Sequence, residues 1–84
     1  MEKDFLELTA QFFGVQRKDI SRATKIDSLE RNFHDRINFS FEIEKRYQIE
    51  FEDQDLQKAH SVKDYLEIVK KKVQRRSEGY KEAA

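Results

Sequence analysis

The sequence contains no cysteine, no proline and only two glycines, Gly14 and Gly79. Without cysteine the chain cannot form disulfides, thiolate metal sites or a thiol nucleophile. An all-β sandwich needs turn residues at every corner, and a chain so poor in glycine and proline offers few of them. These absences favour an all-α protein.

Long apolar runs are missing as well, so we expect neither a membrane span nor a signal peptide, and a cytoplasmic location. Charged residues make up 40% of the 84 residues and apolar ones 37%, but seven phenylalanines and three tyrosines supply large side chains for a core. A chain of this length has room for one core. We expect one helical domain over residues 1–76 and a frayed tail over 77–84.

Apolar spacing predicts helices over residues 4–13, 33–47 and 53–58, and a last one that begins after Ser61. Gly14 is suited to end the first helix, and Ser61 with Asp64 resembles a capping box. Residues 15–27 lack periodicity and indicate a long loop with three apolar anchors, Val15, Ile20 and Ile26. The predicted architecture is a small four-helix bundle, with three main helices, a short third helix and a long loop after the first.

The helix over residues 33–47 has apolar residues around more than half of its circumference. Its two rows are Phe33, Ile37 and Phe41, and Phe39, Ile43 and Tyr47. Such an arc predicts a helix that is packed on two sides. Asn32 is suited to cap it, with Asp35 near the positive end of the helix dipole. Asp27 with Glu30 has the same spacing and leaves open a short helical turn before the main helix.

This order of elements resembles the acyl carrier protein family over nearly the whole chain. The matching segments are Phe-Phe-Gly-Val at 12–15, Lys-Asp-Ile at 18–20, Ala-Thr-Lys-Ile-Asp-Ser-Leu at 23–29, Ile-Glu-Lys-Arg-Tyr at 43–47, Ile-Glu-Phe at 49–51, and Ser-Val-Lys-Asp-Tyr-Leu at 61–66. Glu52 stands where the family usually has a proline. The resemblance implies a carrier rather than an enzyme.

In this register, the family's Asp-Ser-Leu motif falls on Asn32, Phe33 and His34. In the family, the hydroxyl of that serine is joined to 4′-phosphopantetheine. A phenyl ring has no hydroxyl for this phosphodiester, so Phe33 cannot carry the group. We interpret Phe33 instead as a residue at the helix start that closes over the core, and we favour no cofactor.

A literal Asp-Ser-Leu occurs five residues earlier, at 27–29. The first alternative is therefore a true acyl carrier, modified on Ser28 for fatty-acid or secondary-metabolite synthesis. This alternative lengthens the second main helix by about five residues, or roughly 7 Å, and shortens the loop. We favour the other interpretation, in which Ser28 is an exposed loop residue or caps a short turn.

The resemblance also implies protein partners, which in this family dock on the second helix. Here that helix is balanced in charge, with Asp35, Glu42 and Glu44 against Arg36, Lys45 and Arg46, and further acids follow in the connector and third helix. The candidate partner contacts are Asp35, Arg36, Glu42, Glu50, Glu52, Asp53 and Asp55. The leading hypothesis is a monomeric, carrier-protein-like interaction module without the covalent arm.

Other chemistry has little support in the sequence. The two histidines, His34 and His60, are far apart, whereas a metal site needs three or four converging ligands. No nucleotide-binding loop is present, and catalysis is not expected. The basic segment 70–76 gives a second alternative, a binder of nucleic acid or an anionic surface. Because no exposed aromatic row accompanies these residues, we favour a solvated, dipole-complementing helix end.

Overall fold

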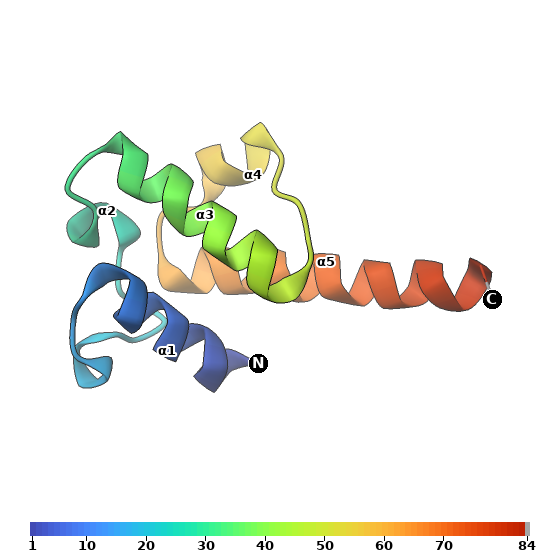
Figure 1. Ribbon diagram of the computed structural model, residues 1–84, viewed down its shortest axis with the longest axis horizontal. Coiled ribbons are helices and arrows are strands. Elements are labelled where there is room, and N and C mark those ends of the chain that lie inside the picture. Colours follow the sequence, from blue (N-terminus) through green and yellow to red (C-terminus); the bar gives the residue numbers. More distant parts are fainter. Residues whose placement is uncertain (84) are drawn as a thin grey trace.

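The computed structural model describes the backbone of residues 1–83 and the side chains of residues 1–32 and 34–75. It confirms the all-α bundle. Its elements are α1 (Glu2–Phe13), the 3-10 turn η1 (Arg17–Asp19), α2 (Ile26–Leu29), α3 (Phe33–Tyr47), α4 (Asp53–Lys58) and α5 (Val62–Ala83). Figure 1 shows α1, α3 and α5 as the main helices, with α4 beside α3 and α5.

The helix ends follow the predicted chemistry. Gly14 ends α1 in the left-handed conformation, with φ at 68°, and the N–H groups of this cap are bonded to α1 carbonyls. The Oδ1 atom of Asn32 accepts a hydrogen bond from the Asp35 N–H at 3.2 Å, so Asn32 caps α3 as expected. The Ser61 hydroxyl accepts from the Asp64 N–H, and Asp64 in turn accepts from the Ser61 N–H. This reciprocal pair is the predicted capping box before α5.

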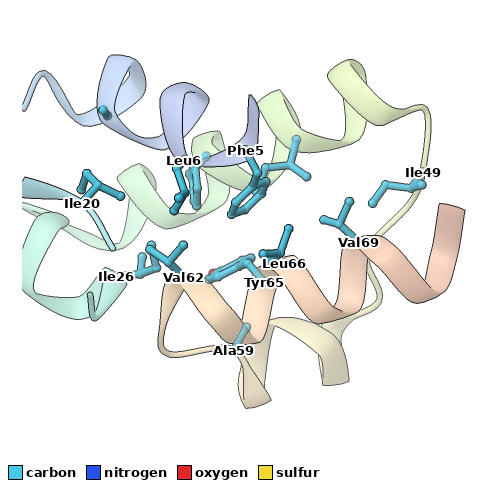
Figure 2. Packing of buried hydrophobic residues seen from close by; sticks show 13 residues of the cluster. Phe5, Leu6, Ile20, Ile26, Ile49, Ala59, Val62, Tyr65, Leu66 and Val69 are labelled. Atoms are coloured by element: carbon cyan, nitrogen blue, oxygen red, sulfur yellow. The ribbon is translucent and has the colours of Figure 1, made fainter. Parts of the chain in front are cut away.

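The core lies where α1, α3 and α5 meet. Phe5 and Leu6 of α1 face Tyr65 and Leu66 of α5 (Figure 2). Thirteen hydrophobic residues form this buried cluster, namely Phe5, Leu6, Ala10, Ile20, Ile26, Phe39, Ile43, Ile49, Ala59, Val62, Tyr65, Leu66 and Val69. Phe39 is fully buried, and its ring centroid lies 5.4 Å from that of Tyr65. Aromatic contacts therefore connect α3 to α5.

The loop after α1 is held by the anchors that the sequence indicated. Ile20 and Ile26 are buried, and the Ile26 N–H donates to the His60 carbonyl at 2.8 Å. A second backbone bond runs from the Val62 N–H to the Thr24 carbonyl, also at 2.8 Å. The loop is shorter than predicted because α2 begins at Ile26. Helix α2 is the short helical turn that the spacing of Asp27 and Glu30 left open as a possibility.

The prediction that α3 is packed on two sides is wrong. The row of Phe39, Ile43 and Tyr47 packs in or against the core, but Phe41 is 56% exposed and Ile37 is half-buried outside the core cluster. The physical reason is the size of α4, which has six residues. Ile37 lines a cleft together with Asp53, Leu56 and Gln57 of α4, whereas Phe41 lies one helical turn further along α3 and outside that lining.

Helix α5 extends beyond the helices that it packs against. Figure 1 shows its C-terminal half extending beyond the other helices, and the molecule measures 42 × 25 × 19 Å. The backbone is helical to Ala83, past the boundary that we drew at Arg76. Side chains from Arg76 onward lie outside the described part, so the division into a domain and a frayed tail stays a prediction. Within the part of the chain that the structure describes, no helix combines the length and apolar character needed to cross a membrane.

Candidate functional site

The start of α3 is the position where the resemblance puts the attachment serine. Asn32 caps the helix, and a second bond runs from the Arg31 N–H to Asp35 Oδ2 at 2.7 Å. Phe33 is the first residue of α3, and His34 is exposed. The Phe33 side chain lies outside the described part, so its packing over the core stays a prediction. Whatever its packing, a phenylalanine at this position supplies no hydroxyl.

Ser28 lies in a separate element. It belongs to α2, which ends at Leu29, and residues 30–32 connect it to α3. The Ser28 side chain is exposed, and its hydroxyl donates to the Lys25 carbonyl at 2.7 Å. Ser28 is therefore not the first residue of the long helix, although its hydroxyl is accessible to solvent.

Arg36 fastens α2 to α3. Its Nε and one terminal nitrogen lie 3.1 and 3.2 Å from the two carboxylate oxygens of Glu30, and the guanidinium also contacts Asp27. The Arg36 side chain is only 16% exposed and that of Glu30 20%. Burial, together with the nearby charge of Asp35, raises the pKa of Glu30. This bidentate geometry holds α2 in place, so Arg36 has an internal role besides its predicted contact with a partner.

The predicted acidic contacts divide into two groups. Asp35 forms part of the α3 cap, and Asp55 pairs with Lys72 of α5 at 3.1 Å. Burial acts to raise the pKa of Asp55, but the Glu52 N–H and Lys72 lower it on balance. These two carboxylates therefore have structural partners.

The remaining candidates face solvent. Glu42 lies 3.7 Å from Lys45, and Glu52 accepts a hydrogen bond from Gln54 at 2.7 Å. Glu50 and Asp53 are exposed and have no ion pair within 4 Å among the described side chains. The connector and the start of α4 thus present acidic groups that a partner can reach.

A cleft between α3 and α4 was not predicted from the sequence. Its volume is about 330 Å³, and its lining consists of Arg36, Ile37, Asp53, Leu56 and Gln57. Sequence reasoning missed it because Ile37 and Phe41 belong to an apolar row that resembles a buried one. The length of the short helix over residues 53–58 was predicted, but no local pattern shows which part of this row that helix covers.

Histidines and cations show no convergence on one site. His60 Nδ1 lies 3.7 Å from Asp27 Oδ2, whereas His34 is at the start of α3. No group of three potential metal ligands occurs among the residues whose side chains are described. In the basic segment, Lys70, Lys71 and Arg75 are exposed, and Lys72 is paired with Asp55. Arg76 lies outside the described side chains.

Comparison with known proteins supports the fold. No protein-family model and no curated protein matches the sequence. Among solved structures, the chain is similar to an acyl carrier protein from Thermotoga maritima, with a TM-score of 0.71 and 24% sequence identity. The alignment covers 89% of this chain and 94% of the other. The chain therefore has the fold of an acyl carrier protein over most of its length.

Proposed function

We propose that this protein is a carrier-protein-like interaction module that works without a covalent 4′-phosphopantetheine arm. The fold of a carrier protein supports a module that engages protein partners rather than an enzyme. The observation that carries the proposal is the start of α3, which is capped by Asn32 and begins with Phe33. The position suited to the arm in this fold thus has no nucleophile.

The residues around α3 do not fit the prosthetic group. A phosphodiester needs a hydroxyl at the helix start, where its charge would lie near the positive end of the helix dipole. Phe33 provides none. The exposed hydroxyl of Ser28 lies in α2, a helix of four residues, and not at the start of the long helix. Within the described part, Arg36 is bonded to Asp27 and Glu30, so it is not free to pair with a phosphate on Ser28.

Ser28 is the basis of the alternative function, because its hydroxyl is exposed. A modifying enzyme that accepts a serine outside the long helix would make the protein a true acyl carrier. We keep this alternative as an outcome of the experiment. A cytoplasmic location and a monomeric state belong to the proposal, on the grounds given by the sequence.

The experiment that decides is the intact mass of the full chain after incubation with coenzyme A and a broad-specificity phosphopantetheinyl transferase. We expect no added mass, because the long helix starts without a serine. A conventional carrier protein in the same reaction is the positive control. An added phosphopantetheine mass that disappears in Ser28→Ala but persists in Ser21→Ala, an exposed loop serine, contradicts the proposal.

A further inference from the structure

The outer side of α5 carries lysines that the fold leaves unpaired. Lys63, Lys70 and Lys71 are exposed, and none of them has an ion pair within 4 Å among the described side chains. Lys63 and Lys70 are two helical turns apart, so they lie on one line along the helix, and Lys71 lies beside that line. The residues that α5 buries in the core lie on its other side.

The tertiary structure brings a fourth lysine to the start of this line. Lys25 forms an antiparallel bridge with Ser61, the residue before α5, and the Lys63 N–H donates to the Arg22 carbonyl at 3.0 Å. Residues that face each other in such a bridge have Cα atoms about 5 Å apart. Lys25 is exposed and also has no ion pair among the described side chains. We define the basic ridge as Lys25, Lys63, Lys70 and Lys71.

The length of α5 changes the interpretation of its basic residues. From the sequence, we favoured a helix end whose cations complement the dipole. The backbone is helical to Ala83, so Lys70 and Lys71 lie about three turns before the end of α5. The effect of the helix dipole falls off within the last turn. Complementing the dipole therefore does not account for these two lysines.

Acids near the ridge reduce its charge without cancelling it. Glu67 is exposed and lies one turn from both Lys63 and Lys71. Glu50 shares a cleft with Arg75, which we therefore leave out of the ridge. Four lysines and one acid, Glu67, leave the ridge a net charge of +3. Because the whole chain has a net charge of zero, this side of the molecule attracts a polyanion although the chain as a whole does not.

The shape and composition of the ridge distinguish between polyanions. A planar anionic membrane would face the whole side of the molecule, Glu67 included, and the ridge offers no apolar side chain to insert. Single-stranded nucleic acid is held largely by stacking on aromatic side chains, and the ridge and its exposed neighbours Glu67 and Gln74 include none. Duplex DNA carries one charge per about 1.7 Å of its axis, so several phosphates face a ridge that runs about 12 Å from Lys63 to Lys71.

We therefore propose that the basic ridge binds the phosphate backbone of double-stranded DNA without reading its bases. Phosphate contacts of this kind position a protein on the duplex and carry no sequence information. This binding goes beyond the proposed carrier-like function and involves neither Ser28 nor the start of α3.

The test measures the fluorescence anisotropy of a labelled duplex of about 20 base pairs, titrated with the full-length chain at several sodium chloride concentrations. Each neutralised phosphate contributes about −0.9 to the slope of log K against log salt concentration, so four lysines predict a slope of about −3 to −4. Two duplexes of unrelated sequence should bind equally.

Variants of single charges test the position of the site. Lys70→Gln should make the slope shallower by about one and weaken binding about tenfold near 0.05 M salt, and Lys25→Gln should do the same. Glu67→Gln should strengthen binding severalfold, because it removes the acid of the ridge. The matched control is Arg31→Gln, which removes an exposed cation that lines a separate cleft with Phe12 and Phe13, and it should leave binding unchanged.

Several results overturn this proposal. They are a slope shallower than about −2, an effect of Arg31→Gln as large as that of Lys70→Gln, or tighter binding of a single-stranded oligonucleotide than of the duplex. Binding of phosphatidylserine–phosphatidylcholine vesicles without binding of the duplex would identify a membrane surface as the occupant instead. Circular dichroism of each variant shows whether it keeps the helical fold. None of these results changes the intact-mass outcome at Ser28, so the two proposals fail separately.

Discussion

Two tyrosines near the core have hydroxyls in opposite situations. The Tyr47 hydroxyl donates to Asp4 Oδ2 at 2.8 Å, which ties α3 to α1. This bond is the largest cause of the lowered pKa of Asp4, and Arg46 adds to it. Tyr65 is fully buried between Phe39 and Phe51, and its hydroxyl has no hydrogen-bond partner among the described residues. One hydroxyl therefore stabilises the fold, and the other adds desolvation cost.

Phenylalanine substitutions measure this difference. Tyr65→Phe should leave the free energy of unfolding unchanged or raise it by up to about 1 kcal/mol, because it removes a buried hydroxyl without a partner. Tyr47→Phe should lower it by about 1–2 kcal/mol, because it breaks a bond to a carboxylate. Urea unfolding followed by circular dichroism gives both values. A loss for Tyr65→Phe as large as that for Tyr47→Phe would mean that the Tyr65 hydroxyl is bonded in solution.

Phe41 is the residue at which pattern and burial disagree. Its four-residue spacing from Ile37 is the same as that between the buried residues Phe39 and Ile43. Spacing alone cannot tell whether a second helix covers a row. The residue-scale prediction failed because burial depends on a contact between elements.

At the scale of elements, the helix ends are the best-predicted features, since a cap involves residues within one turn. Asp64 of the α5 cap accepts hydrogen bonds from the N–H groups of His60 and Ser61 at 3.0 and 3.1 Å. The His60 bond is the largest cause of the lowered pKa of Asp64, although partial burial opposes it. The folded state therefore holds this carboxylate ionised at a lower pH than the unfolded chain does.

This cap should make stability depend on pH. A carboxyl group whose pKa is lowered by folding stabilises the protein above its ordinary pKa, here 3.8, and loses that contribution as the pH falls through the folded-state value. We expect Asp64→Asn to reduce the fall in unfolding free energy between about pH 5 and pH 2. Ser61→Ala is the companion variant. It should cost about 1 kcal/mol near neutral pH by removing the hydroxyl of the cap.

Urea titrations at a series of pH values provide the measurement for both cap variants. If the unfolding free energy of Asp64→Asn falls as steeply toward acid pH as that of the parent chain, the Asp64 carboxylate has no capping bond in solution.

Helix α2 illustrates an element that local pattern barely specifies. A helix of four residues is too short to form by propensity. Its position depends on Ile26, which is buried, and on Arg36, which reaches from α3 to Asp27 and Glu30. The arginine is nine residues from Asp27, too far for the spacing rules of a single helix. Because Arg36 lies beyond the range of those spacing rules, the sequence indicated α2 only as an alternative.

At the scale of the whole molecule, the described side-chain contacts hold only part of α5 to the bundle. Val73 is the last residue of α5 that packs against the core cluster in the described part. Lys72, one residue earlier, forms a half-buried pair with Asp55 at 3.1 Å. The contacts that hold α5 to the bundle thus extend to Val73, within the domain of residues 1–76 that we predict.

Truncation tests this boundary. A chain that ends at Arg76 should keep the free energy of unfolding within about 0.5 kcal/mol of the parent. A chain that ends at Val69 loses Val73 and the Lys72–Asp55 pair, and it should be less stable by about 2 kcal/mol or more. Chemical unfolding of the three chains gives the comparison. A large loss for the Arg76 truncation would place the residues after it in the folded domain.

The sequence by itself determined the fold class, the boundaries of most helices and the absence of a hydroxyl at Phe33. These features depend on composition, on periodicity and on caps such as Asn32 and Gly14, which act within one helical turn. They could therefore be predicted without knowledge of the rest of the chain.

Only the tertiary structure decided which apolar row of α3 is covered, how Arg36 fixes α2, and which acids have an ion pair among the described side chains. The physical reason is the same in each case. Burial and charge pairing depend on where a second element lies: Ile37 shares a cleft with side chains of α4, whereas Phe41 is 56% exposed. Local spacing fixes the direction in which a side chain points along its own helix, whereas the packing of helices decides what it meets.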